Sequence, residues 1–389
     1  MHILALNAGS SSIKYQIFDM CNNELQQQGI AEHIREAATT CYRWQDAEGE
    51  QQAELPGNDH RAIFEHIFRT LKLVCPLNAI THRVVHGGTD FTQPTCVDEP
   101  MLAQLQQLSP LAPLHNPACI AGIETAMTQY PTLPHVAIFD TAFHQSMPEY
   151  AYRYGVSERL YRDFGVRRFG FHGIAHAHLA QQAAEFLEQP LADLNLITLH
   201  LGNGASVTAI EQGRCVDTSM GMTPQAGLVM GSRCGDLDTG AIIALIEQGL
   251  SPAEINKELN QESGLKGLCG NSDMRDIEQR VAIGDKSAEL ALQIFCYRIR
   301  HYLGAYYARL GRVDALLFSG GIGEHSSLIR QRVCEGLGLF GLDLCPTRNQ
   351  AAEQKIRRID TQSTDTAILV IPANEGWEMA RQAYHLLTD

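Results

Sequence analysis

The sequence has no run of basic residues. Its 30 Lys and Arg residues are outnumbered by 44 Asp and Glu residues, which gives a net charge of −14. Surfaces that bind nucleic acid or anionic membranes need clustered positive charge, so neither partner is expected. No apolar stretch reaches the roughly 20 residues of a membrane-spanning helix. Any positive charge that binds an anionic ligand must therefore be concentrated locally.

Paired cysteines and several cofactor motifs are also missing. The 11 cysteines form no C-x-x-C pair, which is typical of reduced thiols in a cytoplasmic protein. The chain begins with the apolar segment MHILAL, without the basic region and cleavage site of a secretory signal, so we expect a cytoplasmic location. H-E-x-x-H, the Walker pattern and G-x-G-x-x-G are absent, which argues against a zinc protease, a P-loop site and a dinucleotide-binding fold.

What is present is a long chain in which strands and helices alternate. The 389 residues, of which 44% are hydrophobic, suffice for two or three domains with sizeable cores. Strand patterns occur at 3–19 and 194–213, each interrupted by a glycine turn, and at 79–86, 135–140, 314–319 and 367–371. Helical patterns occur at 58–74, 99–107, 116–129, 173–187, 239–249, 252–260, 286–310 and 377–387. Short edge strands and loops are expected at 22–57. This alternation predicts an α/β architecture.

One internal similarity indicates a duplicated domain. Asn7-Ala8-Gly9-Ser10-Ser11-Ser12 and Asn203-Gly204-Ala205-Ser206 both lie in predicted turns between two strands, about half of the chain apart. Small residues let backbone N–H groups approach an anion closely. Two such hairpins could hold a polyphosphate, although turns of this composition occur in many hairpins.

Two basic residues stand out in the first half of the chain. Lys14 follows the serines of the first hairpin and could reach a phosphate, or it could simply be exposed. Arg83 lies within the apolar strand pattern of HRVVHGG, where a buried guanidinium needs an anionic partner. That partner is either a ligand or an internal carboxylate. The two following glycines let a ligand or another part of the backbone come close.

Four further segments could contribute to a site. Asp140 follows an apolar strand, at the end where α/β proteins bind ligands, or it caps a helix. His172 lies beside a glycine, but a lone histidine is more often structural. Arg233 is the one basic residue of the long loop 217–240, and loops of this length are usually functional or disordered. FSGGIGEH, at 318–325, predicts a strand, a glycine turn and a helix that could lie against a nucleotide.

In this order, these segments resemble the acetate kinase family, within the actin/hexokinase/Hsp70-like (ASKHA) superfamily. The resemblance extends from Asn7 to Arg381 and rests on NAGSSSIK, HRVVHGG, PLHNP, FDTAFH, RRFGFHG, HLGNGAS, DTSMGMTP, GLVMGSRCGD, SDMRDI, GGIGE and IPANEG. It implies a duplicated two-domain ASKHA fold with the active site in the interdomain cleft. It also implies Mg-dependent phosphoryl transfer between ATP and a short carboxylic acid, giving ADP and an acyl phosphate.

The resemblance further implies a catalytic set. Arg83 would bind the carboxylate or acyl phosphate, Asp140 would lie against the reacting carboxyl group as proton acceptor, and His172 and Arg233 would stabilise the transition state. Positioned cations suit a metaphosphate-like transition state, whose charge is spread over the equatorial oxygens. A carboxylate is already ionised at pH 7, so Asp140 could instead orient other groups.

The remaining implied residues line the binding sites. The apolar pocket for the alkyl end of the acid would comprise Val85, Leu114, Phe171 and Pro224. Phosphate groups would be contacted by Ser10, Ser12 and Lys14, and by His200, Leu201, Gly202, Asn203, Gly204 and Ala205. The adenosine would be bordered by Asp273, Met274 and Arg275 and would lie over Gly321, Ile322, Gly323, Glu324 and His325. Mg²⁺, or Mn²⁺ in its place, would be held by Asn7 and Glu375 together with ATP or ADP.

Val85 leads to an expectation about substrate size. The predicted strand 79–86 places Arg83 and Val85 two residues apart and hence on the same face, so a stiff β-branched side chain would crowd the alkyl end of the acid. We expect acetate to be preferred over propionate, and butyrate to be poor. The alternative is that Val85 is a residue of the core.

Several positions depart from the family pattern. Ile174-Ala175, Gln225-Ala226, Met274, His325 and Gly376 stand where other residues are usual. Since His325 and Met274 would lie on the adenine side, the nucleotide preference is open.

The expected organisation is an N-terminal domain of residues 1–143 plus 377–389 and a C-terminal domain of residues 144–376. The first would bind the acid and phosphate, and the second would bind the nucleotide and form a homodimer. The alternatives are a propionate kinase of the same family and, in another class, a non-catalytic ATP-driven switch.

Overall fold

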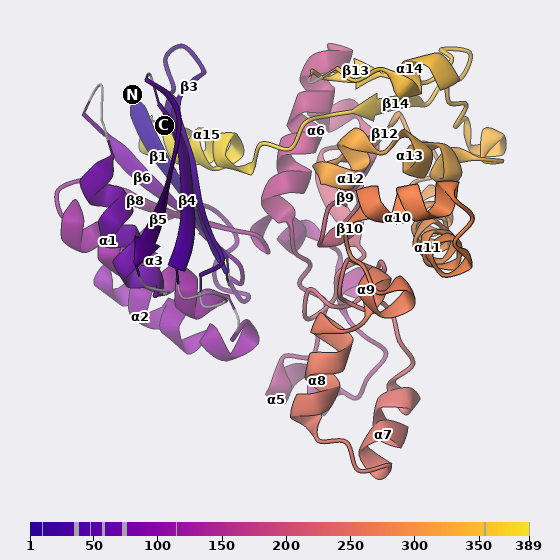
Figure 1. Cartoon of the computed structure of the whole chain (residues 1–389), viewed down its shortest axis with the longest axis horizontal. Helices are drawn as coiled ribbons and strands as arrows, with labels where there is room; N and C mark the ends of the chain where they lie inside the picture. The colour runs from indigo at the N-terminus through magenta and orange to yellow at the C-terminus, as the bar shows by residue number, and fades with distance from the viewer. Residues whose placement is uncertain are drawn as a thin grey trace. The chain divides into compact units, whose positions relative to one another are not determined.

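The computed structural model describes residues 1–9, 11–34, 39–46, 48–56, 59–71, 76–113, 115–353 and 355–388. Ser10 and Leu114, both expected to contact ligands, lie outside these residues. The chain divides into unit 1, residues 1–145 with 374–389, and unit 2, residues 146–373 (Figure 1). We expected the divisions after residues 143 and 376. Glu375 therefore belongs to the same unit as Asn7.

Unit 1 is built on a mixed sheet with the strand order β5-β4-β3-β2-β1-β6-β8-β7. Its strands are β1 (His2–Ala8), β2 (Ser12–Asp19), β3 (Glu24–Glu32), β4 (Thr39–Asp46), β5 (Gly49–Pro56), β6 (Ala79–Val84), β7 (Thr95–Cys96) and β8 (His135–Phe139). Its helical segments are α1 (His60–Thr70), α2 (Glu99–Gln107), η1 (Ser109–Leu111), α3 (Asn116–Gln129), η2 (Ala142–Ser146) and α15 (Glu375–Thr388). β1, β6 and β8 run parallel, whereas β2 runs antiparallel to β1.

Successive side chains along the strands of unit 1 point to opposite faces of the sheet, and both faces are packed. Leu4 and Leu6 of β1 belong to the same buried cluster as Ile63 of α1. The opposite face is covered by α15, where the ring of Trp377 packs edge-on against Phe18 with centroids 5.4 Å apart. Both faces of the central strands are therefore covered, and the polar residues Thr81 and His82 within β6 are buried.

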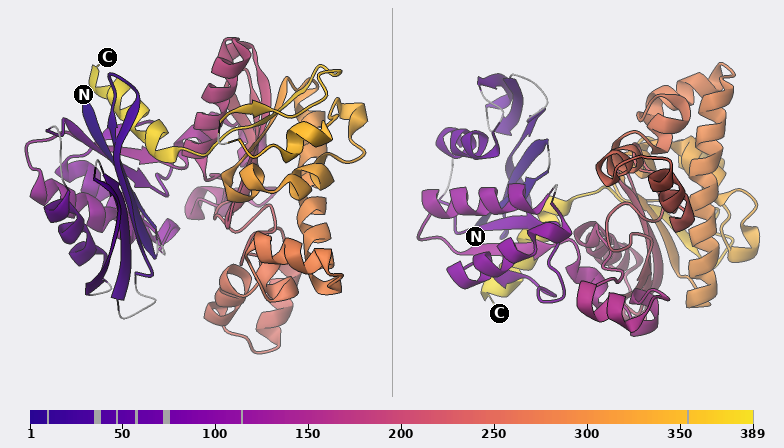
Figure 2. Two further views of the ribbon diagram at one scale, coloured as in Figure 1. Left: turned by 45° about the horizontal axis from the view of Figure 1, so that its top comes forward. Right: turned by 90° about the horizontal axis from the view of Figure 1, so that it is seen from below.

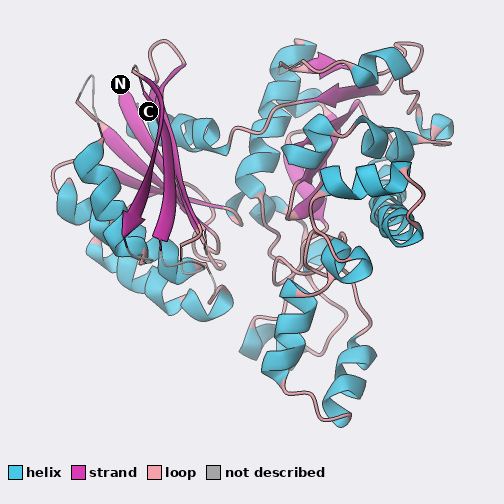
Figure 3. Ribbon diagram, in the orientation of Figure 1, coloured by secondary structure: helices cyan, strands magenta, loops and turns pink. Residues whose placement is uncertain are grey.

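Unit 2 is built on a second mixed sheet with the strand order β11-β10-β9-β12-β14-β13 (Figure 3). Its strands are β9 (Asn195–Leu201), β10 (Ala205–Glu211), β11 (Arg214–Thr218), β12 (Ala315–Ser319), β13 (Arg357–Arg358) and β14 (Ala367–Val370). The helical segments before β12 are α4 (Glu149–Tyr152), α5 (Glu158–Phe164), α6 (Gly173–Leu187), η3 (Leu191–Asp193), α7 (Thr239–Glu247), α8 (Pro252–Gln261), α9 (Gly264–Cys269), α10 (Met274–Ala282) and α11 (Lys286–Leu310). Those after β12 are α12 (Gly320–His325), α13 (Ser327–Cys334), η4 (Gly338–Phe340) and α14 (Pro346–Gln350).

The two sheets share a core arrangement, which confirms the duplicated α/β fold. In each, an antiparallel hairpin continues into two parallel strands: β2-β1-β6-β8 in unit 1 and β10-β9-β12-β14 in unit 2. The similarity that we based on asparagines is misplaced, however. Asn7 lies within β1 and pairs with Lys14, whereas Asn203 lies in the turn after β9. By position in its strand, the counterpart of Asn7 is His200.

Three local expectations were wrong. Residues 22–57 contain the full-length strands β3, β4 and β5, not short edge strands. From the helical spacing of Leu290, Phe295, Ile299 and Leu303 we expected a helix of the core. In α11, the long helix drawn in orange in Figure 2, the last three of these residues are buried but Leu290 is 54% exposed. No separate turn follows β12, because the glycines of FSGGIGEH lie within α12 itself. No helix in the described ranges has both the length and the apolar character needed to cross a membrane.

Candidate active site

The carboxyl ends of the parallel strands of unit 1 bring a charged cluster together. Arg83 of β6 donates from Nε to both carboxylate oxygens of Asp140, which directly follows β8, at 3.0 and 3.1 Å. Its Nη2 also donates to Asp140, and its Nη1 donates to Oδ1 of Asn7 at 3.0 Å. Nδ2 of Asn7 lies 3.4 Å from a carboxylate oxygen of Glu375, the first residue of α15.

The side chains of this cluster are largely withdrawn from solvent. The Asp140 side chain is 1% exposed and that of Arg83 is 17% exposed. Burial alone would lower the pKa of Arg83, but the charges of Asp140 and Glu375 outweigh it, and the pKa is raised above its ordinary value. The guanidinium is therefore held as a permanent cation in a fixed orientation. The sequence left the partner of Arg83 open, and in this structure it includes the internal carboxylate.

Two residues near this cluster lie in surroundings that differ from those predicted from the sequence. Val85 is buried, but β6 ends at Val84 and a bend follows. The strand alternation from which we placed Val85 on the face of Arg83 therefore does not extend to it. A side chain on Gly87 would come within 2.8 Å of the ring of Phe139 and 2.9 Å of the carbonyl of Phe91. This glycine thus permits close packing within the unit.

The oxygen donors near Asn7 can be compared with the needs of Mg²⁺. Glu375 supplies a carboxylate and Asn7 an amide oxygen, which are hard ligands of the kind that Mg²⁺ prefers. The described ranges contain no group of three or more His, Cys, Asp and Glu side chains placed to hold a metal. Two such oxygen ligands would add to the coordination of an ion that the phosphates of a nucleotide also bind.

In unit 2, the hairpin between β9 and β10 forms the second cluster. Its turn is closed by a hydrogen bond from the backbone N–H of Gly202 to the carbonyl of Gly204 at 2.9 Å. The N–H of Gly231 donates to the carbonyl of Asn203 at 2.9 Å, and a side chain on Gly231 would overlap the Asn203 side chain at 1.9 Å. The loop that carries Arg233 is thus packed directly against the turn.

His172 and Arg233 approach this turn together. A Cβ atom placed on Gly204 would lie 3.3 Å from Nε2 of His172 and 3.7 Å from Nη1 of Arg233. His172 is the N-cap of α6 with φ +59°, an uncommon conformation for a residue other than glycine. Arg233 donates from Nη1 to the carbonyl of Pro224 at 3.0 Å. Two cationic or proton-donating groups therefore meet over one glycine.

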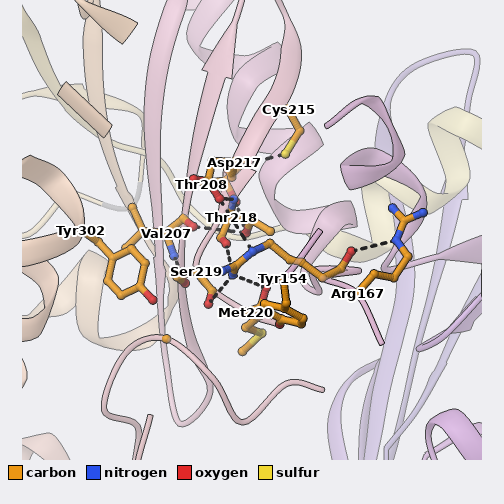
Figure 4. Close-up of polar contacts among 12 residues, drawn as sticks. Tyr154, Arg167, Val207, Thr208, Cys215, Asp217, Thr218, Ser219, Met220 and Tyr302 are labelled. Atoms are coloured by element: carbon orange, nitrogen blue, oxygen red, sulfur yellow. Dashed lines mark hydrogen bonds and ion pairs between the residues drawn. The ribbon is translucent and has the colours of Figure 1, made fainter. Parts of the chain in front are cut away.

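Arg168, four residues before His172 in the sequence, holds the start of the long loop. Its Nη1 donates to the carbonyls of Thr218, Ser219 and Met220 at 2.6, 3.1 and 3.0 Å (Figure 4). Because these three successive carbonyls accept from one guanidinium nitrogen, the chain bends directly after β11. An arginine that precedes an aromatic residue in a loop carries no signal for this role, because its partners are backbone atoms 50 residues away.

The nucleotide candidates fall into two groups. α12, with Gly321, Glu324 and His325, begins beside the end of β9, where a side chain on Gly320 would come within 2.6 Å of the Leu201 carbonyl. That close approach brings α12 next to the turn formed by Gly202, Asn203 and Gly204. The second group lies on α10, which is connected to the end of α12 by a hydrogen bond between Ser326 and Glu278.

On α10 itself, the expected adenosine residues interact mainly with one another. Asp273 is the N-cap and accepts hydrogen bonds from the backbone and guanidinium of Arg275, which lower the pKa of Asp273 to about 2. Met274, between them in the sequence, is buried, whereas Asp273 is half-buried and Arg275 is exposed. The structure therefore brings Gly204, His172 and Arg233 together, and leaves Asp273 and Arg275 paired on the surface.

The sequence model of the acetokinase family matches residues 2–381. The chain belongs to the acetokinase family. It is 48% identical to the acetate kinase of Sulfurovum sp. (strain NBC37-1), with 98% of each chain covered, and 45% identical to that of Streptomyces avermitilis, with 99% of this chain and 97% of the other covered.

Solved structures of acetokinases have the same fold. The acetate kinase of Porphyromonas gingivalis superposes with a TM-score of 0.93 at 35% identity, with all of both chains covered. A propionate kinase from Francisella tularensis gives 0.92 at 37% identity, with 98% of each chain covered. The resemblance on which we based the duplicated fold is thereby confirmed.

One departure from the usual acetokinase pattern has a structural explanation. Gly376 stands where a glutamate is usual, and a Cβ atom there would lie 1.9 Å from the Gln16 side-chain oxygen. Gln16 of β2 therefore occupies the space that a side chain at 376 would need. The loss of this carboxylate leaves Glu375 as the acidic residue at the start of α15 beside Asn7.

Proposed function

We propose that this acetokinase is an acetate kinase, which transfers a phosphoryl group reversibly between ATP and acetate to give ADP and acetyl phosphate. One observation supports it above the others: Nε2 of His172 and Nη1 of Arg233 both lie within 4 Å of the same point over Gly204. Charge develops on the equatorial oxygens during phosphoryl transfer, and donors directed to that charge are the main means of catalysis.

In unit 1, we assign Arg83 to the carboxylate of the acid or the phosphate of the acyl phosphate. A guanidinium suits this task because its planar fork matches two oxygens at once. Asp140 occupies one edge of the fork, and we propose that it acts by orienting Arg83. Val85, Phe171 and Pro224 remain our candidates for the alkyl end of the acid.

In unit 2, we assign the phosphates of ATP to the turn Gly202–Gly204 and the nucleoside to α12. Ser12 and Lys14 of the unit 1 hairpin are the further candidates for phosphate contact. Asn7 and Glu375 would hold Mg²⁺ with the nucleotide, and that ion would neutralise part of the phosphate charge. His172 and Arg233 then donate hydrogen bonds to the transferred group.

We also propose a cytoplasmic homodimer formed through unit 2. The apolar helix α7 leaves Ile243 and Ile246 56% and 44% exposed, as expected of a surface that another subunit covers. Light scattering during size exclusion should give twice the chain mass. A monomer at micromolar concentration would refute this assembly.

The test of the activity is acid-dependent ADP formation, with acyl phosphate trapped as the hydroxamate. We expect turnover with acetate, less with propionate and little with butyrate, complete loss with EDTA and recovery with Mg²⁺. Arg233→Ala should reduce kcat by roughly 10²–10³, whereas Arg312→Ala, at an exposed surface position, should not. ATP hydrolysis at a rate that does not depend on the acid would instead support a nucleotide-driven switch. A preference for propionate would support a propionate kinase.

A further inference from the structure

A chain of three buried side chains runs from the sheet of unit 2 to the half-buried His172. Oγ1 of Thr198 in β9 lies 2.7 Å from Nδ1 of His176, and Nε2 of His176 lies 2.7 Å from Oγ of Ser206 in β10. Oγ of Ser206 lies 2.9 Å from Nδ1 of His172. Thr198, His176 and Ser206 are all completely buried, so water does not compete for these hydrogen bonds.

Each of the three hydrogen bonds needs one proton, and the donors are few. A neutral imidazole has one N–H and one acceptor nitrogen, and a hydroxyl has one O–H. If Thr198 donates to His176, then Nε2–H of His176 donates to Ser206, and Ser206 donates to Nδ1 of His172. If the first bond is reversed, the other two reverse with it. The proton position on His172 is thus tied to Thr198 three hydrogen bonds away.

The geometry favours the first direction. The other acceptor within reach of the Thr198 hydroxyl is the carbonyl of Thr208 at 3.4 Å, which is long for an O–H···O bond, against 2.7 Å to His176. With Thr198 donating to His176, Nδ1 of His172 accepts from Ser206. The proton of a neutral His172 then lies on Nε2, the atom that faces Gly204.

The surroundings of His172 also disfavour an imidazolium. His172 is at the N-terminus of α6, a 15-residue helix, where the helix dipole opposes positive charge. Arg233 approaches the same point over Gly204, and the ring of His200 in β9 lies 4.9 Å away between centroids. Among the described residues, the titratable side chains near His172 in these contacts are those of His176, His200 and Arg233. The positive charge of Arg233 would repel a second positive charge on His172.

We propose that Thr198, His176 and Ser206 are positioning residues that hold His172 neutral, with its proton on Nε2 and directed to the transferred phosphoryl group. This inference rests on the proposed function for its catalytic meaning, but not for the proton arrangement itself. A neutral N–H donor would be available at every pH above the acid range, so phosphoryl transfer would not depend on protonating a histidine.

The arrangement can be read directly in the ligand-free protein. Proteins labelled with ¹⁵N-histidine give two-bond ¹H–¹⁵N correlation spectra that distinguish the two tautomers and the imidazolium, and His172 is assigned by its absence in His172→Gln. In wild type we expect the Nε2–H tautomer from pH 6 to 8. In Ser206→Ala we expect mixed tautomers, because the hydroxyl that donates to Nδ1 of His172 is gone.

Kinetics supplies the second readout. Ser206→Ala should lower kcat by about tenfold with KM for acetate unchanged, since complete loss of one oriented donor typically costs ~10²–10³. Its kcat should rise again at acid pH, where an imidazolium would restore the Nε2 proton. Thr198→Val should change kcat in the same direction, and Thr198→Ser, which keeps the hydroxyl, should resemble wild type.

Thr208→Val is the matched control. Thr208 is equally buried in β10, and its hydroxyl pairs with that of Thr218 at 2.8 Å, outside the chain to His172. It should cost stability without altering the His172 spectrum. An Nδ1–H tautomer or an imidazolium at pH 7 in wild type would overturn the proposal even if Ser206→Ala failed to fold. So would identical spectra and pH profiles in Thr198→Val and Thr208→Val. Absence of kinase activity with the expected tautomer would instead overturn the proposed function.

Discussion

The pair formed by Arg83 and Asp140 allows a sharp test of what Asp140 does. If Asp140 acts by orienting the guanidinium, its loss should reduce kcat through Arg83 and not independently of it. We therefore predict that Asp140→Ala and Arg83→Ala each lower kcat by roughly 10²–10³, the usual cost of one positioned donor. The kcat of the double variant should be no lower than that of the less active single variant, because both changes remove the same oriented group.

The stability effect can be estimated from burial. Asp140 is 1% exposed and Arg83 is 17% exposed, and removing one partner of a buried ion pair typically costs about 3–5 kcal/mol. Asn7 and Glu375 remain near Arg83 in Asp140→Ala, so we expect the lower end of this range. For a unit of this size, Tm changes by about 2–4 °C per kcal/mol. A fall of roughly 6–12 °C is therefore expected.

The assay is the hydroxamate measurement of kcat and KM for acetate, with thermal unfolding of the same four proteins. The corresponding single and double variants of the exposed pair Arg61 and Glu124, 3.9 Å apart, are the control. This pair should contribute less than ~1 kcal/mol to the free energy of unfolding. A double variant whose kcat falls by the product of the two single effects would refute the reasoning. Asp140 would then have a task of its own, such as accepting a proton.

Three further outcomes are expected. Burial lowers the pKa of His86 to about 4, so the unfolded chain takes up this proton first as the pH falls below ~6.5. His86 should therefore contribute roughly 2 kcal/mol to the stability lost between pH 7 and 5, and His86→Asn should reduce the loss measured by urea unfolding by that amount. Val85→Ala should raise kcat/KM for propionate relative to acetate by about tenfold, and an unchanged ratio would remove Val85 from the acid site. Gly320→Ala should lower the free energy of unfolding by more than ~1 kcal/mol in thermal unfolding, because φ is +76° and the new Cβ would lie 2.6 Å from the Leu201 carbonyl. Gly321→Ala is the control and should leave stability unchanged, because a Cβ there has open space around it.

Much of the local structure could be predicted because it depends on residues close together in the chain. The periodicity of 99–107, 116–129 and 173–187 predicted α2, α3 and α6 at their observed bounds. The same reasoning failed for 22–57, where polar, weakly patterned residues form three long strands. Those strands are stabilised by pairing with their neighbours in the sheet, a contribution that periodicity does not measure.

The candidate site shows the same division. An arginine within an apolar strand pattern indicates a buried anionic partner, since an unpaired buried guanidinium is too costly. The sequence therefore marked Arg83 but not its partner. Asp140 meets it because β6 and β8 lie side by side in parallel, which brings residues 57 positions apart within hydrogen-bond distance.

By itself, the sequence determined the alternation of strands and helices, the family resemblance and the isolated polar residues Arg83, His172 and Arg233. Only the tertiary structure decided which of them meet, and on which atoms. His176 is four residues after His172 on one helix face, so its proximity could have been foreseen. The bridging by Ser206 could not, because a hydrogen bond depends on tenths of an ångström between elements that the chain connects only through a sheet and several turns.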